Sequence, residues 1–184
     1  MKPPIPFNVL DCSLDGINLI EASAGTGKTW NICGLYLRLL LERSLEVQQI
    51  LVVTFTDAAT AELRERTRAR IVETLAWLRE GDGTARSRDP FVPDLVRAVG
   101  RRTGFTRSQL ALTLDKALQF FDEAAIFTIH GFCQRALADV SFAAGLPFAL
   151  ELVTDDSAMV MEAVHDFWRR RIAGNGGSQE LATH

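Results

Sequence analysis

A glycine-rich loop, set between a predicted strand and a helical pattern, constrains the fold of this chain more than any other feature. Residues 17–20 predict a short buried strand, and apolar residues that recur every three to four positions predict a helix over residues 28–42. A strand, such a loop and a helix in this order predict a phosphate-binding site in an α/β fold. The loop fits the pattern GxxxxGK[ST], except that alanine takes the first position; its residues are Ala22, Ser23, Ala24, Gly25, Thr26, Gly27, Lys28 and Thr29.

The residue types in this loop match the chemistry of ATP bound with Mg²⁺. Backbone N–H groups must converge on the phosphate oxygens, which requires glycine at Gly25 and Gly27, where a side chain would block the approach. The helix that follows adds the free amides of its N-terminus. We expect Lys28 to reach the β- and γ-phosphates and the Thr29 hydroxyl to bind Mg²⁺, so these two are the candidate catalytic residues.

Two further pairs of a strand and a helix follow the loop. Residues 50–55 predict a strand, and a helix is predicted from Thr56 or Asp57 to about Arg79, with the glycines of residues 81–83 ending it. Residues 125–129 predict a third strand, followed by a helix over about residues 131–139. This alternation indicates a parallel sheet flanked by helices, with ligands at the carboxyl ends of the strands.

Helical patterns fill most of the remaining chain. Weaker helices are predicted between about residues 81 and 121, as an insertion, and another helix over residues 157–171. The tail from about residue 174 is rich in glycine, which predicts flexibility. The predicted fold class is therefore α/β, with a parallel sheet of the P-loop NTPase type, a mainly helical insertion and a helical C-terminal part.

Composition and net charge exclude fewer classes of function than the loop does. The net charge of −3 and the pI of about 5.6 give no support to nucleic-acid binding, which would have to come from local basic groups such as Arg64, Arg66, Arg68 and Arg70. No apolar run approaches the roughly 18–20 residues of a membrane span. The N-terminus also lacks the long apolar stretch of a secretory signal. Three widely spaced cysteines indicate reduced thiols in the cytoplasm rather than a zinc site or a disulfide framework.

An ATP-hydrolysing protein with this loop also needs an acidic residue after an apolar strand, to hold Mg²⁺ and polarise water. Residues 118–123 contain Asp122 and Glu123, but their apolar positions recur with helical spacing, so we interpret this segment as a helix. A complete small-molecule kinase would carry the acidic residue, and a GTPase would carry an Asn-Lys-x-Asp motif. We therefore expect the chain to be one part of a longer protein.

Two later segments carry a family resemblance. Residues 54–64, TFTDAATAELR, resemble the TFTxxAAxE(M/L) motif that follows the second strand in UvrD/Rep-type superfamily 1 DNA helicases. Residues 127–135, FTIHGFCQR, resemble the TxHGF/L motif of the same superfamily. Within it the chain looks most like the RecB-like family, the beta subunits of exodeoxyribonuclease V, through residues 21–29, 35–41 and 122–135. The resemblance covers about residues 7–152.

The resemblance implies a RecA-like helicase motor that uses ATP and Mg²⁺. Residues 1–140 would form the first half of a motor domain, and residues 141–184 the start of an inserted helical subdomain. The resemblance also implies movement on single-stranded or duplex-end DNA in double-strand-break repair and recombination. RecC-like and RecD-like subunits would be the partners, in a bacterial-type cytoplasm. The residues that it places beside DNA are Phe55, Thr56, Arg64, Thr128 and His130.

The sequence also departs from the family. UvrD-type proteins carry an upstream glutamine that reads adenine, and residues 7–11 contain none, which leaves base recognition unassigned. The acidic motif and the second motor domain are missing too, so we expect the chain alone to be inactive. The alternatives are another UvrD-like or AddA-like helicase, a P-loop kinase of a small metabolite, and a nucleotide-binding module without catalysis. Two residue-level alternatives are core packing for Phe55 and a buried, backbone-bonded state for His130.

Overall fold

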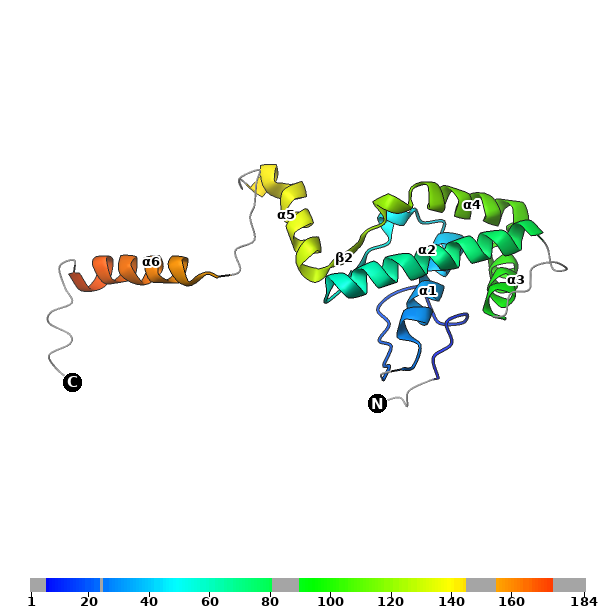
Figure 1. Cartoon of the computed structure of the whole chain (residues 1–184), viewed down its shortest axis with the longest axis horizontal. Helices are drawn as coiled ribbons and strands as arrows, with labels where there is room; N and C mark the ends of the chain where they lie inside the picture. The colour runs from blue at the N-terminus through cyan, green and yellow to red at the C-terminus, as the bar shows by residue number, and fades with distance from the viewer. Residues whose placement is uncertain (1–5, 24, 81–89, 145–154, 174–184) are drawn as a thin grey trace. The chain divides into compact units, whose positions relative to one another are not determined.

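The computed structural model describes residues 6–23, 25–80, 90–144 and 155–173 (Figure 1). The chain forms two compact units, one up to Cys133 and the other from Gln134 onward. Four expectations concern residues outside the described ranges: Ala24 in the loop, the helix end at residues 81–83, the first residues of the insertion and the tail from residue 174. Among the described helices, none combines the length and the apolar character needed to cross a membrane.

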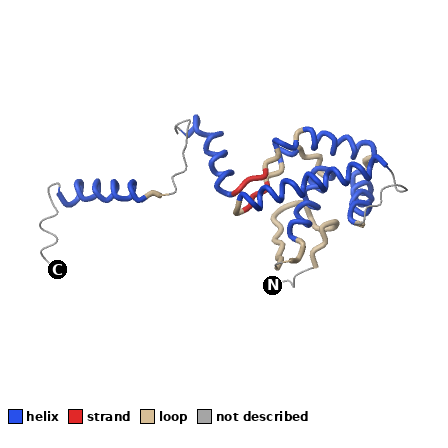
Figure 2. Tube along the Cα trace, in the orientation of Figure 1, coloured by secondary structure: helices blue, strands red, loops and turns tan. Residues whose placement is uncertain are grey.

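Two short parallel strands form the sheet of the described residues: β1 (Val52–Thr54) and β2 (Ile126–Thr128) (Figure 2). The backbone N–H of Val52 donates to the carbonyl of Ala125 at 2.9 Å, and the register pairs Thr54 with Thr128. The prediction of strands in these two segments is confirmed. Because the pairing is parallel and in register, both strands end at the same edge of the sheet.

The predicted strand over residues 17–20 is wrong. This segment has no ladder pairing, and its Ile17 and Leu19 side chains are exposed. A strand is stable only when its backbone N–H and C=O groups pair with a neighbour, and the described residues provide none for this segment. The apolar character of the segment was therefore an insufficient signal, because pairing decides whether a strand forms.

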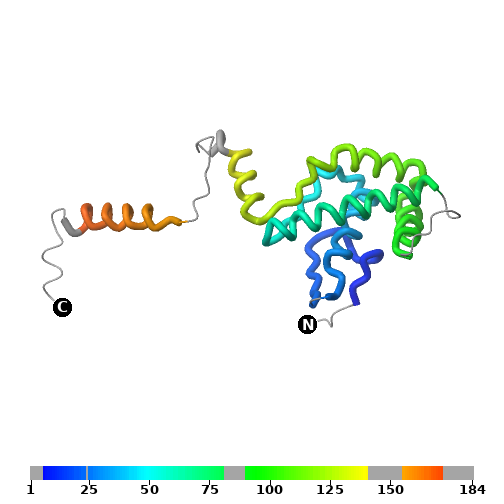
Figure 3. Tube along the Cα trace, in the orientation of Figure 1, coloured from blue at the N-terminus to red at the C-terminus, as the bar shows by residue number. Residues whose placement is uncertain are grey.

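Helices make up most of the described chain, and Figure 3 follows their order along it. The first matches the predicted residues 28–42, and the second ends one residue after the predicted Arg79. Residues 118–123 complete one helix and form a 3-10 turn, which confirms their helical interpretation. The α-helices are α1 (Lys28–Glu42), α2 (Asp57–Glu80), α3 (Phe91–Thr103), α4 (Arg107–Gln119), α5 (Ile129–Ala144) and α6 (Ser157–Trp168), and the shorter turns are η1 (Val47–Gln49), η2 (Phe121–Glu123) and the π-helical η3 (Arg169–Ala173).

Local signals explain where the helices of the insertion begin and end. Thr106 accepts a hydrogen bond from the backbone N–H of Gln109, and the Gln109 side chain accepts one from the backbone N–H of Thr106, which forms a capping box at the start of α4. Gly104 ends α3 with a φ of 71°, a left-handed conformation that favours glycine. The insertion is therefore an ordered helical pair over residues 91–119.

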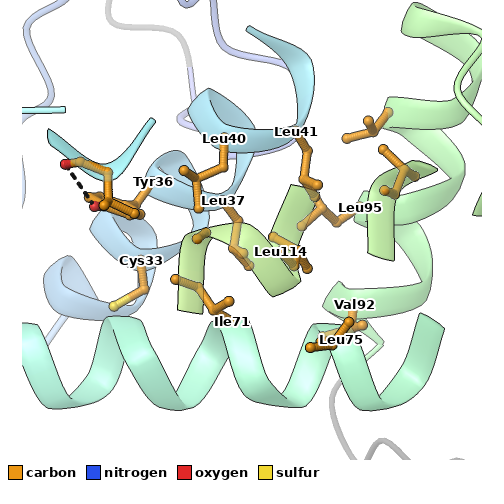
Figure 4. Close-up of a cluster of buried hydrophobic side chains, with 14 of the residues drawn as sticks. Cys33, Tyr36, Leu37, Leu40, Leu41, Ile71, Leu75, Val92, Leu95 and Leu114 are labelled. Carbon is orange, nitrogen blue, oxygen red and sulfur yellow. Dashed lines mark hydrogen bonds between the residues drawn. The ribbon is translucent and has the colours of Figure 1, made fainter. Parts of the chain in front are cut away.

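The core lies between α1 and the helices α2, α3 and α4 (Figure 4). One face of α1 is fully buried, and each of its large apolar side chains contributes about 1.5–3 kcal/mol through removal from water. This packing fixes the position of α1, the helix that begins directly after the phosphate loop. The central side chains are Cys33, Tyr36, Leu37, Leu40 and Leu41 of α1, Ile71 and Leu75 of α2, Val92 and Leu95 of α3, and Leu114 of α4.

A buried arginine ties the segment before the loop to α1. Arg38 is 3% exposed, and its guanidinium donates to the carbonyls of Val9 and Cys12 at 2.9 and 2.8 Å. The same group forms an ion pair with Glu42 at 2.7 Å, one turn further along α1. Because every donor that faces the interior finds an acceptor, the charge is tolerated there.

Candidate nucleotide and nucleic-acid site

The phosphate loop has the backbone that its glycines predict. Gly25 and Gly27 both have a φ of 76°, in the left-handed region, where a side chain is strained. A Cβ added at Gly25 would meet nothing within 4 Å, and one at Gly27 would lie 3.9 Å from the Asn31 Nδ2 atom. The loop surface is therefore open at both glycines, as the approach of a phosphate group requires.

Lys28 and Thr29 lie in the first turn of α1, directly after this loop. The Lys28 Nζ atom donates to the carbonyl oxygen of Ser23 at 2.6 Å, and the Thr26 hydroxyl donates to the same oxygen at 2.8 Å. The lysine thus already points back across the loop, toward an oxygen acceptor. Exposed loop amides, an inward-turned ammonium group and a hydroxyl on the next residue fit a triphosphate with Mg²⁺.

At the end of β1 an aromatic ring faces solvent beside a helix cap. Phe55 is 88% exposed, so core packing at this position is wrong. The Thr56 hydroxyl accepts a hydrogen bond from the backbone N–H of Ala59 at 3.1 Å, which caps the N-terminus of α2. Behind it the Thr54 and Thr60 hydroxyls lie 2.5 Å apart. The hydroxyls order the start of α2 and leave the ring free.

The end of β2 repeats this arrangement. The Thr128 hydroxyl accepts a hydrogen bond from the backbone N–H of Gly131 at 3.1 Å, at the first turn of α5. His130 is exposed, and within the described part of the chain it has no hydrogen-bond partner, so the alternative of a buried, backbone-bonded histidine is wrong. Because Thr54 and Thr128 are register partners, the exposed ring of Phe55 and the imidazole of His130 follow neighbouring strand ends.

Arg64 has a different place from the one expected for a DNA contact. Its guanidinium donates to the carbonyl oxygens of Ala124 and Ile126, at 3.2 and 3.1 Å. The side chain is half-buried between α2 and β2. These bonds account for the arginine without DNA, so the structure favours a structural role for Arg64 over the expected DNA contact.

Sequence reasoning missed an aromatic and cationic group beside the loop. The rings of Trp30 and Phe91 meet edge to face with centroids 4.6 Å apart, and the guanidinium carbon of Arg70 lies 5.6 Å from each centroid. Sequence spacing gave no signal, because the three residues come from α1, α2 and α3. The group ties the first turn of α1 to the insertion.

Comparison with known proteins agrees with this arrangement of motifs. Residues 7–174 match the family described as UvrD/REP helicase N-terminal domain. The chain is 42% identical over 180 residues to the RecBCD enzyme subunit RecB of Haemophilus influenzae, across 92% of this chain and 14% of that protein. It is 46% identical over 166 residues to the Escherichia coli subunit of the same name, across 85% of this chain and 13% of that protein. The Mycobacterium tuberculosis subunit is 38% identical over 162 residues.

These matches cover most of this chain but only a small part of each relative. The chain spans about 14% of the length of the RecB subunits that it matches. The family match takes in the phosphate loop, both strand ends and the helical insertion. The chain therefore belongs to the UvrD/REP helicase family, through the match of residues 7–174 to its N-terminal domain.

Proposed function

We propose that this chain is the N-terminal, ATP-binding part of a RecB-like subunit, an ATP-dependent DNA helicase and exonuclease of double-strand-break repair and recombination. The observation that carries the proposal is the combination of an open phosphate loop with two neighbouring strand ends that present Phe55 and His130 to solvent. The partners would be RecC-like and RecD-like subunits, because the similar proteins are named as subunits of a RecBCD enzyme. The protein would work in the cytoplasm, on single-stranded or duplex-end DNA.

In this proposal the loop residues bind and orient the nucleotide. The amides after Gly25 and Gly27 donate to phosphate oxygens, and Lys28 exchanges the Ser23 carbonyl for a phosphate oxygen. Thr29 holds Mg²⁺, which when bound neutralises charge on the phosphates. The acidic residue that orients water would come from the longer protein. The sheet would then be part of a RecA-like domain with helices on its faces.

The two strand ends form the proposed DNA track. Phe55 would stack on a base, which contributes about 1–3 kcal/mol per base at such platforms. Thr56 and Thr128 cap helices whose N-terminal amides can donate to backbone phosphates, and His130 lies beside them. DNA would therefore be bound at this track through aromatic stacking and contacts to its phosphates, which do not depend on base sequence.

The test is DNA-stimulated ATP hydrolysis by the full-length protein that carries this chain. Lys28→Ala should abolish hydrolysis with and without single-stranded DNA. Lys116→Ala is the matched control, because Lys116 is an exposed lysine paired with Glu46 on a different surface, and its removal should leave the rates unchanged. Equal hydrolysis by the wild-type protein with and without DNA would overturn the helicase proposal. Phosphoryl transfer to a small metabolite by the chain alone would support a kinase instead.

A further inference from the structure

Arg64 lies at the junction between the two DNA-facing strand ends. It belongs to the second turn of α2, the helix that starts directly after Phe55 and Thr56. One of its terminal nitrogens donates to two carbonyls in or just before β2, the strand that ends at Thr128. A single side chain thus connects the segment carrying Phe55 with the segment carrying His130.

Of the two carbonyls bound by Arg64, that of Ile126 lies on the outer side of β2. The Ala125 carbonyl accepts from Val52, so it faces β1. Carbonyls alternate in direction along a strand, so that of Ile126 faces away from β1. The Ala124 carbonyl lies just before β2 and also accepts from the backbone N–H of Ile126 at 2.8 Å. Without Arg64 the outward carbonyl of Ile126 would be open to another strand or to water, and either would compete with α2 for this position. The guanidinium closes this edge.

We propose that Arg64 is a positioning residue, which closes the outer edge of β2 and holds the two DNA-facing strand ends at a fixed separation. The inference rests on the proposed function, because it assigns these ends to the DNA track. It also states that any further strand of this sheet adds beside β1, since the other edge is occupied. Arg64 then acts on DNA only through the placement of Phe55 and His130.

The charge of Arg64 also acts on a side chain of α1, the helix that begins in the phosphate loop. Tyr36 of α1 is buried, and its hydroxyl donates to the carbonyl of Val47 at 3.5 Å. Burial raises the pKa of Tyr36 to about 12, and the nearby positive charge of Arg64 acts against that rise.

Edge closure is tested on the 184-residue chain by amide hydrogen exchange followed by mass spectrometry. In Arg64→Ala, peptides covering residues 124–131 should exchange at least about tenfold faster, while those of α3 stay unchanged. Arg64→Lys should restore most of the protection, because an ammonium group can donate to both carbonyls. Arg79→Ala is the matched control, an arginine of the same helix whose two bonds go to Asp115. If the amides of residues 124–131 in Arg64→Ala exchanged at the wild-type rate, the proposed edge closure would be wrong.

Positioning is tested on the full-length protein by titrating single-stranded DNA and measuring ATP hydrolysis at several salt concentrations. Arg64→Ala should raise the DNA concentration for half-maximal stimulation about tenfold, with the wild-type salt dependence, and Arg64→Lys should recover it. If the salt dependence of DNA binding by Arg64→Ala had a slope lower by about one than in the wild type, Arg64 would contact a phosphate directly and the inference would be wrong. An unchanged DNA concentration for half-maximal stimulation would also overturn it. If wild-type protein shows no response to DNA, the proposed function fails, and the exchange experiment still decides the edge closure.

Discussion

The residues at the two strand ends fall into two groups. Some bind backbone groups and stabilise the fold, and others face solvent. Thr56 and Thr128 cap helices, and Arg64 binds carbonyls, so these three stabilise the fold. Phe55 has no such role, because most of its ring is exposed. A large exposed aromatic side chain contributes little to the fold and is available to stack on a ligand.

Phe55→Ala should therefore separate DNA binding from stability. We expect the free energy of unfolding to change by no more than about 0.5 kcal/mol, because the ring leaves little buried surface behind. In the full-length protein, DNA binding should weaken by about 1–3 kcal/mol, as measured by fluorescence anisotropy. Phe121→Ala is the contrast: that ring is 2% exposed, and its loss should cost about 3–5 kcal/mol of stability. Tight DNA binding by Phe55→Ala would remove the ring from the track.

The Arg38 and Glu42 pair should make stability depend on pH in the acid range. Burial acts to raise the pKa of Glu42, but its hydrogen bonds and charge interactions with Arg38 and Arg102 outweigh burial and hold it below its ordinary value of 4.5. A carboxyl group with a lowered folded pKa adds stability that is complete above the unfolded value and is lost as the pH falls through the folded pKa. Urea unfolding between pH 7 and pH 3, at steps of about half a unit, should show this loss below about pH 4.5. Glu42→Gln should flatten that part of the plot of unfolding free energy against pH. If the plot did not change in this variant, another group would be responsible for the loss of stability in acid.

At the scale of elements, the phosphate loop depends on how closely α1 approaches its neighbours. Gly34 permits that approach, because an added Cβ would lie 2.8 Å from the Val9 Cγ2 atom and 3.0 Å from the Phe91 Cζ atom. Val9 belongs to the segment before the loop and Phe91 to the start of α3. The glycine therefore brings three parts of the chain together around one turn of α1.

Gly34→Ala should destabilise the chain by about 1–3 kcal/mol, in spite of the higher helix propensity of alanine. The matched control is Gly100→Ala in α3, where the nearest atom would be 3.9 Å away, so the propensity gain of up to about 1 kcal/mol should appear alone. Chemical denaturation of both variants measures the difference. Equal effects in the two helices would show that the close approach at Gly34 carries no cost.

Features of this fold that depend on neighbouring residues could be predicted from the sequence, whereas those that depend on distant residues could not. The bounds of α1 and α2 follow from apolar spacing and from residues next to the helix ends, so they were predicted closely. The strand over residues 17–20 was not, because its pairing depends on a neighbour elsewhere in the chain. Arg64 was assigned to DNA because its acceptors, Ala124 and Ile126, lie about sixty positions away and carry no signal in their side chains. The left-handed backbone at Gly25 and Gly27 was predicted because it depends on local chemistry, and the nucleotide contacts of the loop stay a prediction.

At the scale of the whole molecule, the two compact units differ in how they contribute to stability. The unit up to Cys133 contains the buried cluster around α1. In the second unit, α6 has no buried residue among those described, and Met161, Phe167 and Trp168 are exposed. We infer that cooperative unfolding of this chain reports on the first unit.

Removal of residues 145–184 should therefore leave the melting temperature within about 2 °C of that of the whole chain, because no buried side chain of α6 is lost. Differential scanning calorimetry measures it, and the enthalpy of unfolding should likewise hardly change. A fall of more than about 5 °C would show that the second unit stabilises the first.

The parallel register of β1 and β2 has an electrostatic consequence for a chain with a net charge of −3. Each strand runs directly into a helix, so the starts of α2 and α5 share one edge, and each helix dipole places about half a positive charge there. The peptide groups alone would sum to about one elementary charge, and the carboxylate of Asp57 in the first turn of α2 offsets part of it. Such a potential fades within about one helical turn, so it cannot attract DNA from a distance. It should prolong the residence of a strand already bound, and leave the association rate to the rest of the protein.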